Sequence, residues 1–143
     1  MQRLLIVDSD ARSRLSWLDA LRERFEIEVV RKGEIPIRRV RSVRPQVVIL
    51  SLSRGRVQEI LRWSRTIKTD STTPPVVVIF DPSGRIRDPG QALETYMADG
   101  LLRGAASLDA RRDFIQSILE GEAGQFVEFP VENWTRRLLG RRR

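Results

Sequence analysis

The amino-acid sequence predicts an α/β domain in which a parallel sheet is covered by helices on both faces. Three short apolar runs rich in β-branched residues support this prediction, at residues 4–7, 45–52 and 76–80. Runs of this length and composition are typical of strands buried on both faces of a sheet. Segments with helical spacing separate the runs, and strands that alternate with helices form a sheet between two helical layers. The chain is therefore expected to form a three-layer, doubly wound domain.

In the first half of the chain, strands are expected at residues 3–7, 26–30 and 45–52, and helices at 11–25, 35–43 and 56–68. The first helix follows an acidic turn in which Asp10 can cap the helix N-terminus. Spacings of three and four residues predict its inward face. That face consists of Leu15, Leu18, Leu21 and Phe25, with Trp17 near its edge. Pro36 belongs in the first turn of the second helix, where proline is tolerated, and Pro45 ends that segment.

In the second half, strands are expected at 75–80 and 100–103, and helices at 91–98 and 107–120. The same spacing argument predicts the inward stripe of the helix over 56–68, which is Val57, Ile60, Leu61 and Ser64. Residues 81–90 contain two prolines and two glycines and form a loop longer than most in α/β units. The fourth helix should turn Ala92, Leu93, Tyr96 and Met97 inward. Ser107 should cap the last helix, whose inward side chains are Leu108, Phe114, Ile115, Ile118 and Leu119.

The composition limits the chemistry that the chain can perform. Its 143 residues are enough for one domain with a core. It contains no cysteine and no histidine, so it has no disulfide, no thiolate metal site and no histidine base. No apolar run approaches the ~20 residues of a membrane span, and the N-terminus shows no signal-peptide pattern. A cytoplasmic, non-enzymatic protein without a cofactor is expected.

Positive charge is concentrated between residues 31 and 65. The chain has a net charge of +7, and all but two of its 26 basic residues are arginine. Residues 31–65 hold ten basic and two acidic residues, whereas residues 1–30 hold five basic and six acidic ones. Arginines of the second and third helices can form a patch that binds phosphates, anionic lipid or an acidic protein. They are Arg38, Arg39, Arg41, Arg54, Arg56, Arg62 and Arg65. The alternative is a solvated arginine-rich face, and the sequence contains no recognisable nucleic-acid-binding motif.

The last residues, 121–143, are expected to form a tail beyond a domain at 1–120. The tail contains an extended segment over 126–130 and one or two helical turns over 134–139. Aromatic residues beside arginines are common in protein interfaces. The tail is therefore expected to pack on its own domain, exchange in a dimer or contact a partner. The residues concerned are Phe126, Phe129, Trp134 and Leu138.

Three local motifs, in this order and spacing, resemble the receiver domain of two-component response regulators over about residues 2–120. Residues 5–10 resemble the opening strand and acidic turn, and residues 45–52 resemble the strand that carries the phosphoacceptor aspartate. Residues 98–103 resemble the approach to the fifth strand. The resemblance implies a flavodoxin-like sheet of five parallel strands in the order 2-1-3-4-5, followed here by a C-terminal extension.

The resemblance also implies a phosphorylation site, and this sequence has lost most of it. Phosphoryl transfer in such domains needs an acceptor aspartate, an acidic pair that holds magnesium, a hydroxyl residue and a lysine. The acceptor position aligns with Ser51, the hydroxyl position with Phe80 and the lysine position with Gly104. Arg103 is the nearest cation, but strand alternation should point it to the other face of the sheet.

The acidic pair is also incomplete. Asp8 is kept, Ser9 stands at the second position, and Asp10 lies one residue beyond it. Asp8 and Asp10 are candidates for binding a divalent cation, but such ions need several oxygen ligands. The favoured interpretation is that Asp8 is a remnant and Asp10 a helix cap. Asp81 is expected to begin an Asp-Pro turn, with an added metal ligand as the alternative.

These substitutions predict a degenerate pseudo-receiver that binds partners without phosphorylation, in bacterial signalling or localisation. The partner is expected to be a protein of unknown identity. Candidate surfaces are the arginine face, the tail, and the side formed by the fourth helix, fifth strand and fifth helix, through which receivers often dimerise. One alternative is nucleic-acid or anionic-surface binding through residues 31–65. Another is a residual switch that responds to metal or phosphate, including modification of Ser51 itself.

Overall fold

The structure is a computed structural model that describes residues 1–52, 56–121 and 125–128. Its strands form one parallel sheet in the order β2-β1-β3-β4-β5-β6. The strands are β1 (Gln2–Val7), β2 (Phe25–Val29), β3 (Val47–Ser51), β4 (Val76–Asp81), β5 (Gly100–Arg103) and β6 (Gln125–Glu128). The predicted order of the first five strands is confirmed, and a sixth strand extends the sheet beyond β5.

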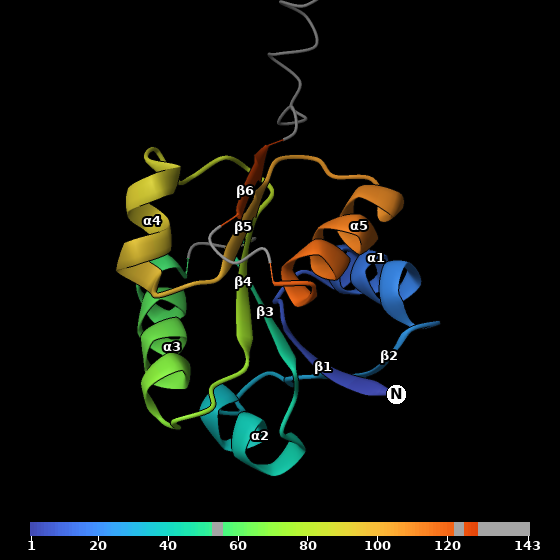
Figure 1. Cartoon of the computed structure of the whole chain (residues 1–143), viewed down its shortest axis with the longest axis vertical. Helices are drawn as coiled ribbons and strands as arrows, with labels where there is room; N and C mark the ends of the chain where they lie inside the picture. Colours follow the sequence, from blue (N-terminus) through green and yellow to red (C-terminus); the bar gives the residue numbers. More distant parts are fainter. Residues whose placement is uncertain (53–55, 122–124, 129–143) are drawn as a thin grey trace, which may run out of the picture.

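Helices cover both faces of this sheet, as the sequence predicts. They are α1 (Ala11–Leu21), α2 (Pro36–Val43), α3 (Val57–Thr69), α4 (Pro89–Tyr96) and α5 (Leu108–Leu119). Figure 1 shows α1 and α5 together on one face and α2, α3 and α4 on the other. None of the helices in the described part of the chain is long and apolar enough to cross a membrane.

Each face of the sheet has its own hydrophobic core, because side chains alternate along the strands. On the side of α1 and α5, Trp17, Phe114 and Ile115 pack against Ile6, Ile49 and other strand residues. On the side of α3 and α4, Ile60, Ile67 and Tyr96 pack against alternate strand residues such as Leu50 and Ile79. All five residues of β3 are buried, which accounts for its continuous apolar sequence.

The predicted inward face of the first helix is partly wrong. Trp17 and Ala20 are buried, whereas Leu15 is 60% exposed. The helix ends at Leu21, and Phe25 opens β2 by pairing with β1. Leu21 belongs to both stripes, but the buried stripe is centred roughly a quarter turn from the leucine stripe. Asp10 caps the helix as expected, accepting hydrogen bonds from the backbone N–H groups of two first-turn residues.

The last two helices differ from prediction at single positions. The fourth helix begins two residues earlier than expected, with Asp88 as N-cap and proline at its first position. Met97 ends it in a left-handed conformation (φ +55°), which turns its side chain outward to 37% exposure. Ser107 caps α5 as predicted. Leu108 is 42% exposed, in contrast to its predicted burial, because it lies in the first turn before the inward face begins.

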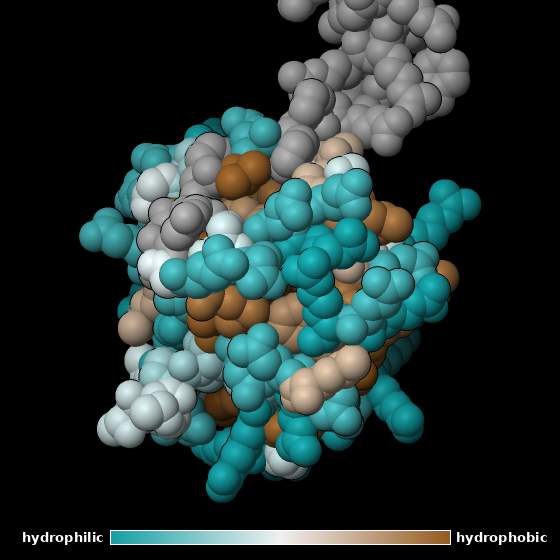
Figure 2. Space-filling view, turned by 45° about the vertical axis from the view of Figure 1, so that its right-hand side comes forward, coloured by the Kyte–Doolittle hydropathy of each residue, from teal (hydrophilic) through white to brown (hydrophobic). Residues whose placement is uncertain are grey.

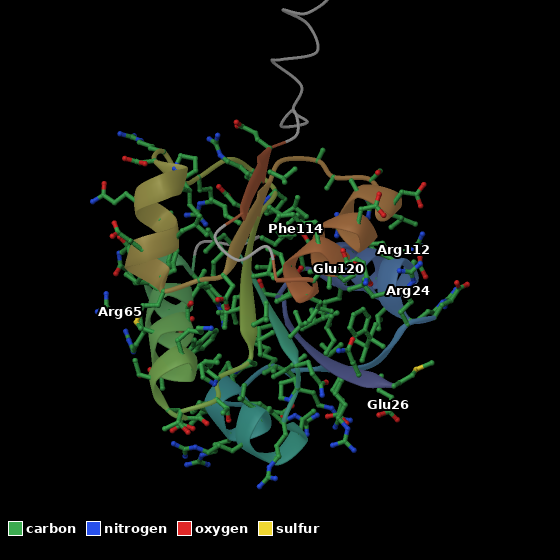
Figure 3. The ribbon with its side chains drawn as sticks, viewed as in Figure 1. Arg24, Glu26, Arg65, Arg112, Phe114 and Glu120 are labelled. Atoms are coloured by element: carbon green, nitrogen blue, oxygen red, sulfur yellow. The ribbon has the colours of Figure 1, made fainter. Side chains whose placement is uncertain are left out.

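Helices α1 and α5 are tied together by arginine side chains as well as by the core. Arg112 donates from Nε to the Ala20 carbonyl at 2.9 Å, and Arg24 donates to the Gln116 side-chain oxygen at 3.4 Å. Figure 3 shows Arg24 and Arg112 at this junction. On the face shown in Figure 2, hydrophobic residues gather near the centre and are bordered by hydrophilic residues.

Candidate functional site

Three strands bring the remnants of the expected site together at their carboxyl ends. Asp8 directly follows β1, Ser51 ends β3, and Phe80 stands in β4 opposite Ser51 in the strand register. All three are buried, with exposures of 4%, 5% and 1%. This edge of a parallel sheet is where open α/β folds place their ligands. The structure therefore places Asp8, Ser51 and Phe80 at the same edge of the sheet.

The two aspartates of the opening turn are used for local structure. Asp8 accepts the backbone N–H of Asp10 through Oδ1 at 2.9 Å. Asp10 in turn accepts the N–H groups of Arg12 and Ser13 at 2.9 and 3.1 Å. Ser9 is exposed between them. The described residues contain no group of three or more acidic side chains close enough to hold a metal ion.

Phe80 is part of a stack of aromatic and cationic groups beside Asp8. The Trp17 and Phe80 rings meet edge to face, with centroids 5.1 Å apart and an interplanar angle of 85°. The guanidinium carbon of Arg111 lies 4.8 Å from the Trp17 ring centroid and 4.6 Å from that of Phe80. Desolvated cation–π contacts of this kind are worth up to about 2 kcal/mol. On the side of α1 and α5, this edge of the sheet is thus filled by packed side chains.

Arg111 is a buried cation near Asp8 that was not predicted from the sequence. It comes from α5, is only 9% exposed, and donates from Nε to the Ala106 carbonyl at 3.1 Å. Burial lowers the pKa of its guanidinium, and the nearby charge of Asp8 raises that pKa in opposition. An available signal was its spacing, because Arg111 precedes the buried Phe114, Ile115 and Ile118 by three, four and seven residues.

Gly104, which the resemblance aligns with the family's lysine, directly follows β5. Gly104 has a positive φ of 93°, and its N–H donates to the Asp81 carbonyl. Arg103 extends over the other face, where its Nε lies 3.6 Å from a carboxylate oxygen of Asp81 and its guanidinium also contacts Glu128. Asp81 is fully buried and accepts backbone N–H groups from Arg85 and from the residue after it, so it supports the turn after β4.

The Ser51 hydroxyl forms no hydrogen bond to a base among the described residues. Its Oγ is buried and has no hydrogen-bond partner among the described residues. A serine hydroxyl is a weak nucleophile unless a neighbouring base accepts its proton. The sequence has no histidine, and the guanidinium of Arg111 near Asp8 cannot act as a base. The arrangement therefore does not favour covalent chemistry at Ser51.

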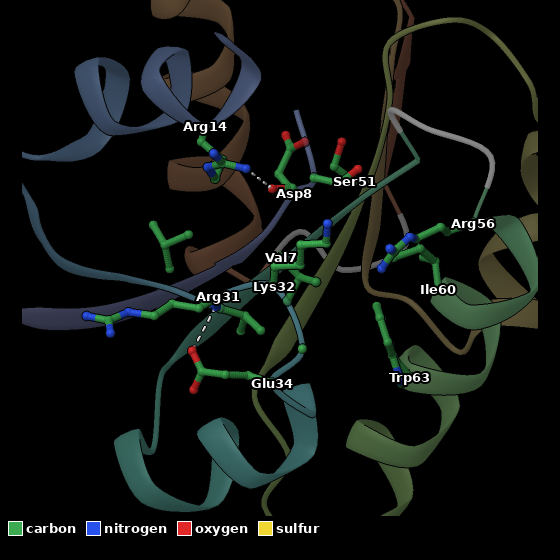
Figure 4. A pocket seen from close by; sticks show the side chains of 14 residues that line it. Val7, Asp8, Arg14, Arg31, Lys32, Glu34, Ser51, Arg56, Ile60 and Trp63 are labelled. Carbon is green, nitrogen blue, oxygen red and sulfur yellow. Dashed lines mark hydrogen bonds between the residues drawn. The ribbon is translucent and has the colours of Figure 1, made fainter. Parts of the chain in front are cut away.

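A cleft of about 620 Å³ opens beside Asp8 and Ser51, between the ends of β1, β2 and β3 and helix α3. Its charged lining residues are Asp8, Arg14, Arg31, Lys32, Glu34 and Arg56. Ser51 lies at its base, and Ile60 and Trp63 form an apolar wall from α3. Figure 4 shows the side chains of Lys32 and Arg56 directed into the cleft and that of Arg31 directed away from it.

The arginines of the predicted patch are largely engaged with acids. Arg39 pairs with Glu28 and Glu34, Arg41 with Asp70 at 2.6 Å, and Arg56 with Glu59 at 3.6 Å. Arg65 instead donates to the Thr95 carbonyl at 3.2 Å and lies on the outer side of α3 (Figure 3). Within the described ranges, Arg38 and Arg62 form no ion pair.

Several predicted interaction residues cannot be placed. Arg54, Phe129, Trp134 and Leu138 lie outside the described residues. Phe126 is a residue of β6, which pairs in parallel with β5. The part of the tail that was expected to be extended therefore joins the sheet from residue 126 to residue 128.

Comparison with known proteins identifies the fold. No protein-family model matches the sequence, and no curated protein matches it. Among solved structures, the N-terminal domain of the nisin resistance regulator NsrR superposes with a TM-score of 0.72 at 15% identity, covering 83% of this chain and 98% of that one. The chemotaxis response regulator CheY4 of Vibrio cholerae gives 0.68 at 16% identity, covering 82% and 98%. The pseudo-receiver domain of the CikA protein gives 0.60 at 14% identity, covering 85% and 97%.

These structures are receiver domains of response regulators and one pseudo-receiver. The chain therefore has the flavodoxin-like receiver fold, which confirms the fold predicted from the resemblance. At identities this low, the likeness concerns the fold.

Proposed function

We propose that this protein is a pseudo-receiver that binds a protein partner without being phosphorylated. The observation that carries the proposal is the packing of Trp17, Phe80 and Arg111 beside Asp8, where the resemblance implies a hydroxyl residue and a pocket for a phosphoryl group. Ser51, at the end of β3, supplies a neutral hydroxyl in place of a carboxylate. Acyl-phosphate chemistry needs a carboxylate acceptor, which Ser51 does not supply, and Phe80 with its stack occupies the position where the resemblance implies a hydroxyl residue.

The solved structures are consistent with a binding role. CikA contains a domain described as a pseudo-receiver. Another similar structure, with a TM-score of 0.65, is that of the histidine kinase ThkA in complex with the response regulator TrrA. By analogy, we propose that the present chain acts in bacterial signalling, in the cytoplasm, by docking to a protein. The proposed role makes it a non-enzymatic module.

Phosphorylation can be tested directly by intact-mass spectrometry. The protein is incubated with acetyl phosphate and magnesium beside a conventional receiver domain as positive control. We expect the phosphoryl mass increment on the control alone. A magnesium-dependent increment on this protein that is lost in Asp8→Asn or Ser51→Ala would refute the proposal and revive the residual switch.

A matched variant tests the reason for this inactivity. Ser51→Asp restores the carboxylate while leaving Phe80, Trp17 and Arg111 in place. We expect Ser51→Asp to stay unmodified, because the acidic pair is incomplete and Phe80 stands where the resemblance implies a hydroxyl residue. Efficient phosphorylation of this single variant would show that the missing aspartate alone accounts for the loss.

The competing proposal of nucleic-acid binding through residues 31–65 receives less support. Glu28, Glu34, Glu59 and Asp70 interrupt the arginine face by pairing with its members. Binding to random DNA should accordingly be weak, with a shallow dependence on salt. A steep salt dependence that Arg38→Gln with Arg62→Gln removes would favour the competing function.

A homodimer through α4, β5 and α5 remains a prediction, and β6 changes the surface involved. In this chain β5 pairs with β4 on one side and β6 on the other, so its backbone is not a free edge. Sedimentation of the whole chain and of a Glu128→Arg variant tests this. The variant breaks the ion pair between Arg103 and Glu128 at the outer strand. If a dimer forms on this side, we expect the variant to change its dissociation constant.

A further inference from the structure

The cleft beside Ser51 has the features of a binding site for an anionic small molecule. It lies where β1 and β3 are neighbours although their connections leave to opposite faces of the sheet. Such a switch point leaves a crevice at the carboxyl ends of the strands, and ligands of open α/β sheets bind there. Its volume of about 620 Å³ is within the usual range for small-molecule sites.

The charges in the cleft favour an anion. Four cations line it, against two carboxylates. Both carboxylates already accept backbone N–H groups: Asp8 from Asp10, and Glu34 from Arg31 at 2.8 Å. Glu34 is further compensated by Arg39 at 3.5 Å. The negative charges of Asp8 and Glu34 are therefore partly compensated by groups of the protein itself.

The cations directed into the cleft have fewer acidic partners than the two carboxylates have donors. Lys32 forms no ion pair within the described residues, and Arg56 has only an exposed contact of 3.6 Å with Glu59. Both side chains point into the space between Ser51 and Trp63 in Figure 4. They come from different elements, the turn after β2 and the start of α3, so a ligand between them would be held from two sides.

Ser51 gives an independent indication of a ligand. Its residue is 5% exposed and lines the cleft, and its hydroxyl has no partner among the described residues. An unpaired buried hydroxyl costs free energy, roughly 1–3 kcal/mol by mutational estimates. A phosphate oxygen in the cleft would accept the hydrogen bond from this Oγ. Replacement of a carboxylate by a serine removes the negative charge that would otherwise repel the phosphate.

The opposite wall is suited to a flat apolar group. Trp63 is half-buried and stands beside Ile60 on α3, with Val29 and Val30 across the cleft at the end of β2. Aromatic side chains stack on nucleic-acid bases with about 1–3 kcal/mol per base. A phosphate held by Lys32, Arg56 and Ser51 would leave an attached base near the Trp63 wall.

From this arrangement we propose that the cleft binds a nucleotide non-covalently and without a metal ion. Lys32 and Arg56 contact its phosphate, Ser51 donates to a phosphate oxygen, and Trp63 packs on its base. This site is independent of partner docking, since a protein that docks without phosphorylation does not require it.

The test is isothermal titration calorimetry on the full chain in EDTA. The probes are purine and pyrimidine nucleoside mono- and diphosphates, the corresponding nucleosides, and inorganic phosphate. We expect at least one nucleotide to bind about 10-fold or more tighter than either its nucleoside or inorganic phosphate, because charge-assisted contacts and stacking act together. Addition of magnesium should not strengthen this binding, because Mg²⁺ competes with Lys32 and Arg56 for the same phosphate oxygens.

Variants locate the site. Lys32→Gln with Arg56→Gln should weaken binding about 10-fold or more, and Ser51→Asp should weaken it further by placing a negative charge at the base of the cleft. Arg62→Gln is the matched control, because Arg62 is an exposed arginine on the same helix outside the cleft. All three substitutions involving arginine or lysine are at exposed positions, and circular dichroism checks the fold of each variant.

Every other outcome overturns the proposal. Absence of nucleotide binding refutes it outright. Equal binding of inorganic phosphate shows a simple anion site without base recognition, and equal binding of the nucleoside shows that the cations are not used. Loss of affinity in Arg62→Gln to the same extent as in the cleft variants places binding on the general surface charge.

Discussion

The stack of Arg111 on Phe80 can be measured by a double-mutant cycle. Arg111→Met removes the charge and keeps an unbranched side chain, whereas Phe80→Leu removes the ring and keeps an apolar one. The free energy of unfolding of both single variants and of the double variant gives the coupling between the two groups. Because the cycle subtracts each single effect, the changed packing of either residue with Trp17 cancels to first order.

The structure sets the expected size of this coupling. The guanidinium carbon is 4.6 Å from the Phe80 ring centroid, Arg111 is 9% exposed and Phe80 is 1% exposed. Cation–π contacts range from about 0.5–1 kcal/mol at exposed sites to about 2 kcal/mol when desolvated. We therefore expect a coupling of about 1–2 kcal/mol.

Urea unfolding with linear extrapolation supplies the four free energies, provided that the slope with denaturant stays constant among the variants. Arg112→Met is the matched control. Arg112 is the next residue of the same helix, but it contacts the Ala20 carbonyl and Asp109. Its cycle with Phe80→Leu should give a coupling within about 0.5 kcal/mol of zero. A coupling for Arg111 no larger than this control would show that the stack is a coincidence of packing.

Three further variants test the packing and the titrating groups. Gly100→Ala should lower the free energy of unfolding by about 1–3 kcal/mol in thermal or urea unfolding. The reason is that its Cβ would lie 3.0 Å from the buried Phe114 ring. An unchanged free energy of unfolding would show that α5 can shift. Burial raises the pKa of the Tyr96 phenol. The stabilisation from the neutral phenol is therefore complete below the ordinary phenol pKa and is lost as pH rises through the folded value. Tyr96→Phe should remove this loss of unfolding free energy at alkaline pH, and an unchanged loss in the variant would contradict the expectation. The hydrogen bond from Arg41 lowers the pKa of Asp70, so its small stabilisation is present above the ordinary carboxyl pKa and is lost as pH falls through the folded value. Asp70→Asn should flatten the acid limb of the stability profile, and an equally steep limb in the variant would be evidence against this pair.

The predicted strands agree well with the structure because buried parallel strands leave a strong local signal. Residues 47–51 are apolar except at the last position, and all of them are buried. The order of strands followed from the resemblance, since no local feature fixes which strands become neighbours. Helix ends were predicted where a cap or a proline determines them, as at Asp10, Pro36 and Ser107.

Where prediction was wrong, a tertiary contact had overridden a local pattern. Leucine spacing placed Leu15 inward, but the helix turns Trp17 to the core, where its ring meets Phe80. Phe25 was assigned to the helix because it fits the spacing, and its pairing with β1 is visible only in three dimensions. The extended segment after residue 125 was recognised, but its place beside β5 was not.

Some residues of the candidate site could be named from the sequence, and others only from the structure. Substitutions at Ser51, Phe80 and Gly104 can be read directly against a known pattern. The position of Arg111 beside Trp17 and Phe80 could not, because Arg111 comes from a helix instead of the strand end. The cleft was also beyond sequence analysis, since Lys32, Arg56 and Trp63 meet only after β2 and α3 are placed around the ends of β1 and β3.

The pairing of β6 with β5 affects how shortened versions of this protein will behave. A fragment that stops at residue 120 would satisfy the usual length of such a domain, yet it would expose the N–H and C=O groups that β5 now shares with β6. Bare strands of this kind recruit other chains and promote aggregation. Self-association of a trimmed fragment would then reflect where the cut was made, and oligomeric state is better measured on the intact chain.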